Sequence, residues 1–266
     1  MKKTPPQWAR WGPDQPEQHY LIEPRYLAGG GDLRHVTEYL RASGWIDKTK
    51  RDGPLVFVSR DKSTQVAYDP YAQPGGWRIQ GAATAHQDAW HVTFDRHTPV
   101  EIVAGMTDAL TRPATAHAPN VWGPLQQQRW RRAPGGHPTA ISPDGAAFLQ
   151  WHQAGPGQAV WRLGAGVETV LSWSATATST TPMHLMEALT TAMAAPEPVM
   201  RPRGHVPPTS RIRAHSRSVL PSQLRGWQQN RLNAARAATW ARGGWTSARP
   251  RGKVPPRFAA QGVRNR

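Results

Sequence analysis

The chain of 266 residues contains no cysteine, so disulfide frameworks, thiol nucleophiles and zinc sites with Cys ligands are excluded. No run of apolar residues is long enough to cross a bilayer, and the first six residues, MKKTPP, lack the apolar stretch of a signal peptide. We therefore expect a soluble, cytoplasmic protein without a membrane partner.

Signatures of the common enzyme classes are also missing. The chain has no His-Glu-x-x-His pattern, no Gly-x-Ser-x-Gly segment and no phosphate-binding loop ending in Gly-Lys-Ser/Thr. The glycines at 29–31 precede Asp32, and we interpret them as a tight turn with a helix cap rather than as a phosphate site. His91, Asp95 and His97 are interpreted as solvent-facing residues rather than metal ligands. We expect no enzyme activity, no cofactor and no metal.

Acidic residues are absent from the last quarter of the chain. Residues 201–266 contain 15 Lys and Arg and no Asp or Glu, whereas residues 1–200 contain 18 basic and 17 acidic residues. Fifteen of the sixteen net positive charges therefore belong to a C-terminal arm attached to an almost neutral body. Such a charge asymmetry is typical of an arm that meets an anionic partner.

The body contains an internal duplication. The segment from Trp90 to Pro113 recurs 83 residues later, from Trp173 to Pro196, without a gap. Further pairs share this offset or differ from it by one or two residues, as small loop insertions would produce. These pairs are Ser59 with Ser142, Asp61 with Asp144, Tyr68 with Trp151, Trp77 with Trp161, and Val36, Leu40 and Trp45 with Val121, Leu125 and Trp130. We infer a tandem duplication.

Local signals predict the same order of elements in each copy. In the first copy, Asp32 is a candidate cap for an amphipathic helix that ends near Gly44. Four short β-type runs follow, at 55–60, 64–68, 76–80 and 89–95, with connections short enough for an antiparallel meander. Thr98, Pro99 and Glu101 then predict a capping box that starts a closing helix over 99–111.

Side chains alternate between the two faces of a strand, which predicts the orientation of the strand residues. Trp77 and Ile79 are expected on the face that packs against the closing helix, as are Trp161 and Leu163 in the second copy. Arg78 and Arg162 are then expected on the opposite, open face. Trp90 and Trp173 are expected in the core, because a duplicated core retains aromatics at matched positions.

The run RYLAGGGD at 25–32, the segment from Trp90 to Glu101 and the tandem arrangement resemble the actinobacterial family known as domain of unknown function 317. The resemblance covers about residues 19–196 and is stronger in the first copy, because the second lacks the Gly-rich run. It implies a bacterial cytoplasmic protein and little about chemistry. In outline only, the paired units are also similar to the PUR and Whirly families, whose open sheet faces bind single-stranded nucleic acid.

These observations predict an α+β protein. It consists of two tandem repeats, each a helix, a four-stranded antiparallel sheet and a helix, packed as a pseudo-dimer with a basic, partly helical or disordered C-terminal arm. The predicted boundaries are an irregular leader over 1–18, repeats over 19–116 and 117–198, and the arm over 199–266. Within the arm, the Pro-rich residues 201–208 are expected to be extended and disordered, and residues 221–240 are expected to form a helix.

The arm favours a non-enzymatic nucleic-acid-binding function of low sequence specificity, with DNA expected rather than RNA. Arginine matches phosphate geometry, and the interleaved Trp residues offer stacking contacts. The candidate contacts in the arm are Arg211, Arg213, Arg217, Arg225, Trp227, Arg231, Arg236, Trp240, Arg242, Arg249, Arg251 and Lys253. Those in the repeats are Arg78, Arg162, Arg129, Arg131 and Arg132.

Two alternatives stay open. The arm helix could dock on the repeats through Leu224, Trp227 and Leu232, which is compatible with exposed arginines. The paired repeats could instead be a protein-interaction scaffold with a partner on the open sheet face or an exposed strand edge, in which case the arm serves only localisation or assembly.

Overall fold

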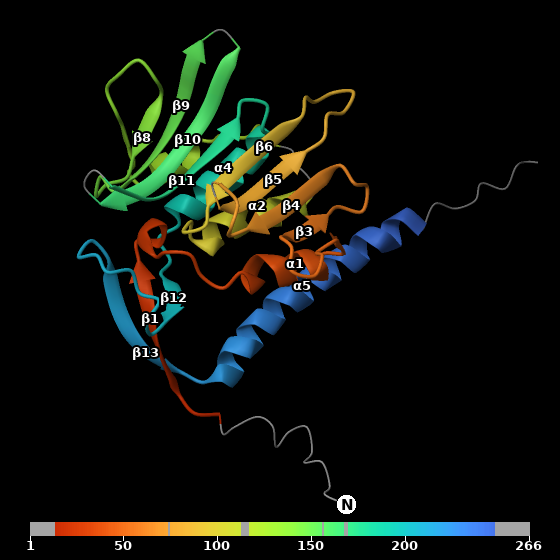
Figure 1. Ribbon diagram of the computed structural model, residues 1–266, viewed down its shortest axis with the longest axis vertical. Helices are drawn as coiled ribbons and strands as arrows, with labels where there is room; N and C mark the ends of the chain where they lie inside the picture. The colour runs from red at the N-terminus through yellow and green to blue at the C-terminus, as the bar shows by residue number, and fades with distance from the viewer. Residues whose placement is uncertain (1–13, 74, 113–116, 156, 168–169, 248–266) are drawn as a thin grey trace, which may run out of the picture.

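The computed structural model describes residues 14–247 except 74, 113–116, 156 and 168–169. Its largest feature is one antiparallel ten-stranded sheet with the order β2-β3-β4-β5-β6-β11-β10-β9-β8-β7 (Figure 1). Its strands in the first repeat are β2 (Ile46–Asp47), β3 (Leu55–Val58), β4 (Thr64–Asp69), β5 (Gly76–Gly81) and β6 (Trp90–Asp95). Those in the second repeat are β7 (Arg131–Arg132), β8 (Thr139–Ile141), β9 (Ala147–Gly155), β10 (Gln158–Val167) and β11 (Val170–Thr178).

The two repeats meet at equivalent strands. β6 ends the first half of the sheet and β11 ends the second, and they pair through Ala175 with Phe94, Thr176 with Thr93 and Ala177 with Val92. The duplication and the paired α+β architecture are therefore confirmed. Each half contains the four expected strands plus a two-residue strand, β2 or β7, which is too short for alternation to reveal.

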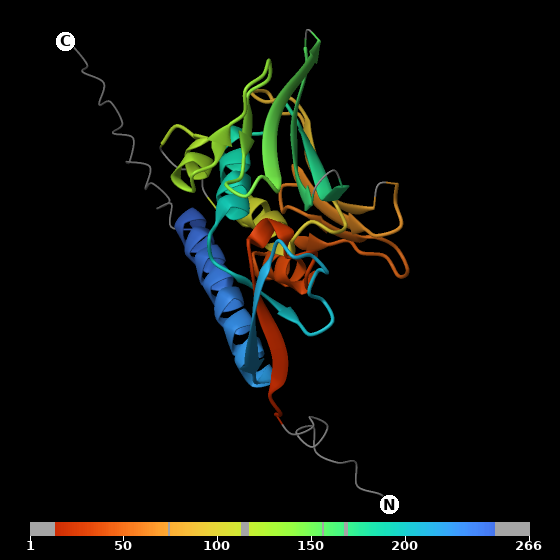
Figure 2. The same cartoon turned by 90° about the vertical axis from the view of Figure 1, so that its left-hand side faces the viewer.

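Helices cover one face of this sheet, and the other face is left open (Figure 2). The helices are α1 (Arg34–Ala42), α2 (Val100–Leu110), α3 (Gly123–Gln127) and α4 (Met183–Ala194). The closing helices α2 and α4 pack on each other, and their approach requires a small residue at Gly105. A Cβ atom added there would lie 2.3 Å from the Cβ of Ala192.

The core lies between the sheet and these helices, as the alternation predicts. Trp77, Trp90, Trp161 and Trp173 are buried. An aromatic pair is duplicated with the repeats: the rings of Tyr68 and Trp77 are 4.8 Å apart, and those of Trp151 and Trp161 are 4.6 Å apart.

A turn of the sheet is also duplicated. Ser59 donates a hydrogen bond of 2.6 Å to Asp61 between β3 and β4, and Ser142 donates one of 2.6 Å to Asp144 between β8 and β9. In both turns the serine hydroxyl then accepts a backbone N–H from the start of the next strand. The sequence Ser-x-Asp therefore favours this turn, because the side-chain oxygens of Ser and Asp accept hydrogen bonds from backbone N–H groups of the turn.

A second, three-stranded sheet joins the two ends of the described chain, in the order β12-β1-β13. Its strands are β1 (Glu17–Glu23), β12 (Val199–Pro202) and β13 (Arg213–Val219), at the lower left of Figure 1. The expected disorder of residues 201–208 is therefore wrong at its start, where Arg201 and Pro202 pair with β1. The expected leader and arm boundaries also cut through this sheet.

The closing helix of the first repeat starts where expected but without a capping box. The Thr98 hydroxyl is buried and has no hydrogen-bond partner among the described residues, and no side chain caps α2 at Pro99. Glu101 instead binds Arg201. The capping-box prediction is wrong because a long-range ion pair outcompetes the local contact.

The last described element is the helix α5 (Pro221–Ser247), longer than predicted, which packs along α1 (Figure 1). Leu232 and Ala235 are buried against Tyr39. Docking through Leu232 agrees with one of the alternatives above, but Trp227 is 55% exposed and takes no part in it.

Candidate functional site

Arg201 is the first basic residue of the expected arm, and it is buried in the body. Its guanidinium makes two contacts with the Glu101 carboxylate, at 2.7 and 2.8 Å, and donates to the carbonyls of Ala28, Gly29 and Gly30 at 2.9–3.1 Å. The Gly-rich run therefore presents carbonyl oxygens to a cation, as expected of a turn and not of a phosphate loop. Burial raises the pKa of Glu101, but hydrogen bonds and the charge of Arg201 outweigh it and hold that pKa below its usual value.

Arg231 of α5 is also directed inward. It donates to both carboxylate oxygens of Asp108 at 2.8 Å and to the backbone carbonyl of His35 at 2.7 Å, and it lies over the ring of Tyr39. Since its donors are used within the protein, Arg231 anchors α5 and is removed from the expected nucleic-acid contacts.

The other described arginines of the C-terminal segment are exposed: Arg203, Arg211, Arg213, Arg217, Arg225 and Arg236. Arg211 donates to the Asp144 carbonyl, and Arg213 lies 3.3 Å from Glu23 at the surface. Exposed ion pairs of this kind exchange readily with solvent and with other anions. Trp240 is 77% exposed. The side chain of Arg242 and the residues Arg249, Arg251 and Lys253 lie outside the described part of the chain.

β13 leads directly into α5, and these exposed arginines are distributed along the two consecutive elements, which we call the C-terminal basic region (Figure 1). On β13, Arg213 and Arg217 are four residues apart and share a face, about 13 Å from each other along the strand. On α5, Arg225 and Arg236 are eleven residues apart, which places them about 20° apart around the helix. Such spacing can follow the phosphates of a nucleic-acid backbone.

The open sheet face carries a symmetric row of polar side chains. Thr93 of β6 and Thr176 of β11 lie opposite each other, and their hydroxyl oxygens are 2.8 Å apart. Arg78 is paired with Thr93 on the outer side, and Arg162 is paired with Thr176. Both arginines are exposed, as the alternation predicts. Three strand spacings separate them, or about 14 Å.

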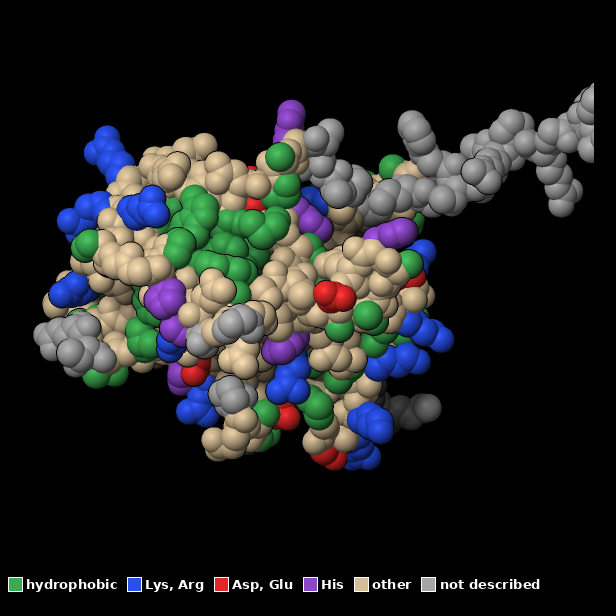
Figure 3. Space-filling model, turned by 90° about the horizontal axis from the view of Figure 1, so that it is seen from above, with side chains coloured by type: hydrophobic (Ala, Val, Ile, Leu, Met, Phe, Trp, Pro, Cys, Tyr) green, Lys and Arg blue, Asp and Glu red, His purple; other side chains and the backbone are tan. Residues whose placement is uncertain are grey.

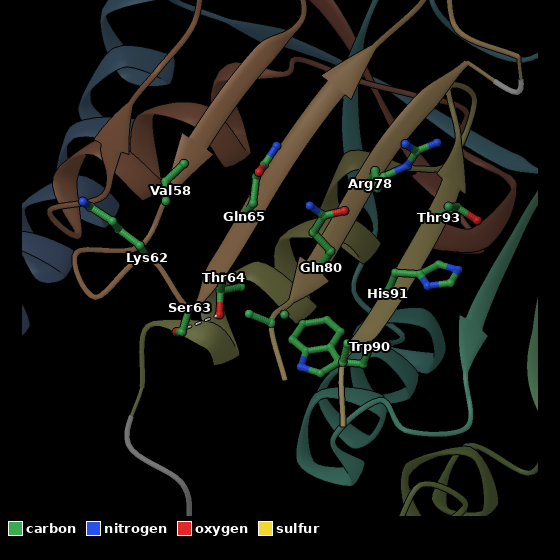
Figure 4. Close-up of a pocket in the computed structure, with 13 residues that line it drawn as sticks. Val58, Lys62, Ser63, Thr64, Gln65, Arg78, Gln80, Trp90, His91 and Thr93 are labelled. Carbon is green, nitrogen blue, oxygen red and sulfur yellow. Dashed lines mark hydrogen bonds between the residues drawn. The ribbon is translucent and has the colours of Figure 1, made fainter. Parts of the chain in front are cut away.

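A cavity of about 540 Å³ lies beside Arg78 on the open face of the first repeat. Gln65, Arg78, Gln80 and His91 project into it from β4, β5 and β6 (Figure 4). Of the residues that line this cavity, the sequence predicts only Arg78 as a nucleic-acid contact, although strand alternation places Gln65 and Gln80 on the same open face of the sheet.

The basic cluster of the second repeat lies apart from this cavity. Arg129, Arg131 and Arg132 are exposed around the start of β7, and Arg132 borders a cavity of about 530 Å³ between α3 and β8. Viewed from the top of Figure 1, hydrophobic side chains gather in one area of the surface with basic side chains at its border (Figure 3).

Neither a metal cluster nor a membrane helix is found within the described residues. No three His, Asp or Glu side chains there lie together as metal ligands would. His97 instead lies in a turn, where its backbone N–H donates to Asp95. No described helix has the length and apolar character needed to cross a bilayer.

Comparison with protein families confirms the resemblance noted from the sequence. The model of the SPDY family, a domain of unknown function (DUF317), matches the chain twice, over residues 58–116 and 141–199. Each match runs from the end of β3 or β8 through the following closing helix, so the chain carries the domain as a tandem pair. No curated protein and no solved structure matches the chain.

Proposed function

We propose that this tandem DUF317 protein is a non-enzymatic nucleic-acid-binding protein of low sequence specificity. One observation carries the proposal: residues 201–266 hold 15 basic residues and no acidic one, and the described arginines of β13 and α5 are exposed apart from Arg231. Phosphate contacts dominate the affinity of such surfaces, because each neutralised phosphate releases counterions. These contacts position the nucleic acid and carry no sequence information.

The two inward arginines explain how a basic segment is held on an almost neutral body. Arg201 and Arg231 each bind a carboxylate of α2, through Glu101 and Asp108. The segment is therefore fixed at two points, and its other arginines whose side chains the structure describes are exposed. A fixed arrangement reduces the conformational entropy lost on binding.

Deletion of residues 199–266 cannot test the proposal, because it removes β12, β13 and Arg201. A truncation after Ser247 removes six basic residues and leaves all described elements in place. We expect it to weaken binding of both single-stranded and duplex DNA oligonucleotides and to reduce the slope of log K against log salt by up to about 5 units. Fluorescence anisotropy at several salt concentrations measures both quantities.

A second test of the same proposal substitutes Arg225 and Arg236 by Gln in the full chain. Both residues are exposed, so stability is expected to be unchanged. The control replaces the exposed pair Lys50 and Arg51 on the β2–β3 loop by Gln, which removes the same charge elsewhere. Equal affinities of all variants at low salt would overturn the proposal and leave the scaffold hypothesis. RNA oligonucleotides of the same sequence test the expected preference for DNA.

A further inference from the structure

We propose that the open face of the first repeat, and not that of the second, holds a single nucleic-acid strand. The site is the groove along β4, β5 and β6 that contains the cavity beside Arg78 (Figure 4). This inference rests on the proposed function, since it assigns the unpaired strand a place distinct from the C-terminal basic region.

The lining of the groove favours an anionic ligand. The cavity beside Arg78 is bordered by two cations, Arg78 and Lys62, together with amides, hydroxyls and His91, and none of its thirteen residues is acidic. Its residues are Val58, Lys62, Ser63, Thr64, Gln65, Arg78, Gln80, Gly81, Ala82, Ala89, Trp90, His91 and Thr93. Within the described residues, neither Arg78 nor Lys62 forms an ion pair, so neither cation has a paired counter-charge in this cavity. A phosphate would supply one.

The groove is long enough for several nucleotides. A second cavity of about 270 Å³ lies further along the same strands and shares Gln65, Arg78, Gln80 and Thr93 with the first. Its lining also includes one acidic residue, Asp69, which places a negative charge at this end of the groove. The two cavities therefore form one path parallel to β5, whose six residues span about 20 Å. A path of this length suits a polymer better than a small molecule.

Three side chains in the groove have unused hydrogen-bonding groups. Within the described residues, the side chains of Gln65, Arg78 and Gln80 make no hydrogen bond or ion pair. Each amide offers two donors and an acceptor, which match the Watson–Crick edge of an unpaired base. In a duplex that edge is occupied by the partner strand, so the groove favours a single strand.

The second repeat lacks these groups at the equivalent positions. Phe148 replaces Gln65, Gly164 replaces Gln80, and Ser174 replaces His91. The Phe148 ring lies over Gly164, where an added Cβ would be 3.3 Å from it. Gln150 is used within the sheet, because its amide donates to Thr139. Only Arg162 remains as the counterpart of Arg78.

This asymmetry supplies a matched control for the experiment. Arg78→Gln and the double variant Gln65→Ala/Gln80→Ala are compared with Arg162→Gln in the full chain. The first two are expected to weaken binding of a single-stranded oligonucleotide by about tenfold, and Arg162→Gln by less than twofold. Binding of the duplex of the same sequence should change less than twofold in all three. Arg78, Gln80 and Arg162 are exposed and Gln65 is half-buried, so we expect the fold to stay intact, and circular dichroism checks this.

Several outcomes would overturn the inference. Equal losses for Arg78→Gln and Arg162→Gln would mean that both halves of the face bind alike. Unchanged single-strand affinity in every groove variant, with weakened binding after truncation at Ser247, would exclude the groove and keep the proposed function. If a nucleoside monophosphate bound as tightly as the oligonucleotide, the groove would be a site for a small ligand and not for a strand. Absence of any nucleic-acid binding would reject both proposals.

Discussion

The two repeats share their buried side and differ on their open side. The aromatic pair at the core, the Ser-x-Asp turn and the closing helix recur at matched positions, as do Arg78 and Arg162. On the open face, by contrast, the Thr–Arg row is symmetric, but Phe148 and Gly164 of the second repeat replace the glutamines Gln65 and Gln80 of the first. Packing constrains the core of both copies, because changes of even one methylene there cost stability. The open face of each copy is free to acquire a different role.

A second difference concerns where the rest of the chain attaches. Glu101 and Asp108 of α2 bind the C-terminal segment, whereas His184 and Thr191 occupy the equivalent positions in α4. The first repeat therefore carries both the groove and the anchors of the basic segment. Substitutions that remove first-repeat residues, or replace them by their second-repeat equivalents, test whether the two repeats differ in this way.

The largest effect is expected from Arg201→Leu. It leaves the Glu101 carboxylate buried without its partner and removes three contacts to the carbonyls of residues 28–30. Breaking one side of a buried ion pair costs about 3–5 kcal/mol of unfolding free energy. Urea denaturation monitored by tryptophan fluorescence measures the loss.

Arg203→Leu, at an exposed position two residues later on the same segment, is the control. We expect it to change stability by less than about 0.5 kcal/mol. A similar small change for Arg201→Leu would show that the first repeat does not depend on the anchor.

A smaller, pH-dependent effect is expected at His35, whose equivalent in the second repeat is Asn120. Burial, followed by the charge of Arg231, lowers the pKa of His35 to about 4, with Arg201, Glu101 and Asp32 also close by. The unfolded chain binds this proton near pH 6.5, so stability falls as the pH is lowered from 6.5 to 4.

His35→Asn transfers the second-repeat residue into the first and removes this dependence. The unfolding free energy of the variant minus that of the original chain should therefore rise by about 2–3 kcal/mol when the pH is lowered from 7 to 4.5. Urea denaturation at both pH values gives the difference, and His86→Asn in an exposed loop controls for the loss of a histidine. Parallel stability curves for the original chain and His35→Asn would contradict the prediction.

The repeats themselves could be predicted from sequence because their signals are local. Alternation places Trp77 and Arg78 on opposite faces, and short turns connect strands that pair with their neighbours. The pairing of β6 with β11 and the sheet β12-β1-β13 could not be predicted in this way, because their partners are about 80 to 200 residues apart. β13, with the sequence RAHSRSV, has no apolar alternation that would mark it as a strand.

The candidate site was predictable only in part, for a related reason. Composition identifies a basic segment, and alternation gives the outward direction of Arg78 and Arg162. Neither composition nor alternation distinguishes Arg201 and Arg231 from the exposed arginines. The two are held inward by Glu101 and Asp108, which are distant in sequence, so the local sequence pattern carries no sign of it. Gln65 and Gln80 were overlooked because they carry no charge, and they matter only through the shared cavity.

The smallest effect tests the contact between the repeats at their pseudo-symmetric helices. Gly105 of α2 faces Ala192 of α4, so Gly105→Ala brings two Cβ atoms within 2.3 Å unless the helices move apart. We expect a loss of about 1–3 kcal/mol, although alanine favours a helix by up to about 1 kcal/mol over glycine. Gly226→Ala on α5 is the matched control, because its added Cβ meets nothing within 4 Å and should stabilise the protein. Adding Ala192→Gly to Gly105→Ala should recover part of the loss in urea denaturation. If Gly105→Ala stabilised the protein as Gly226→Ala does, the two repeats would not be held together by close helix packing.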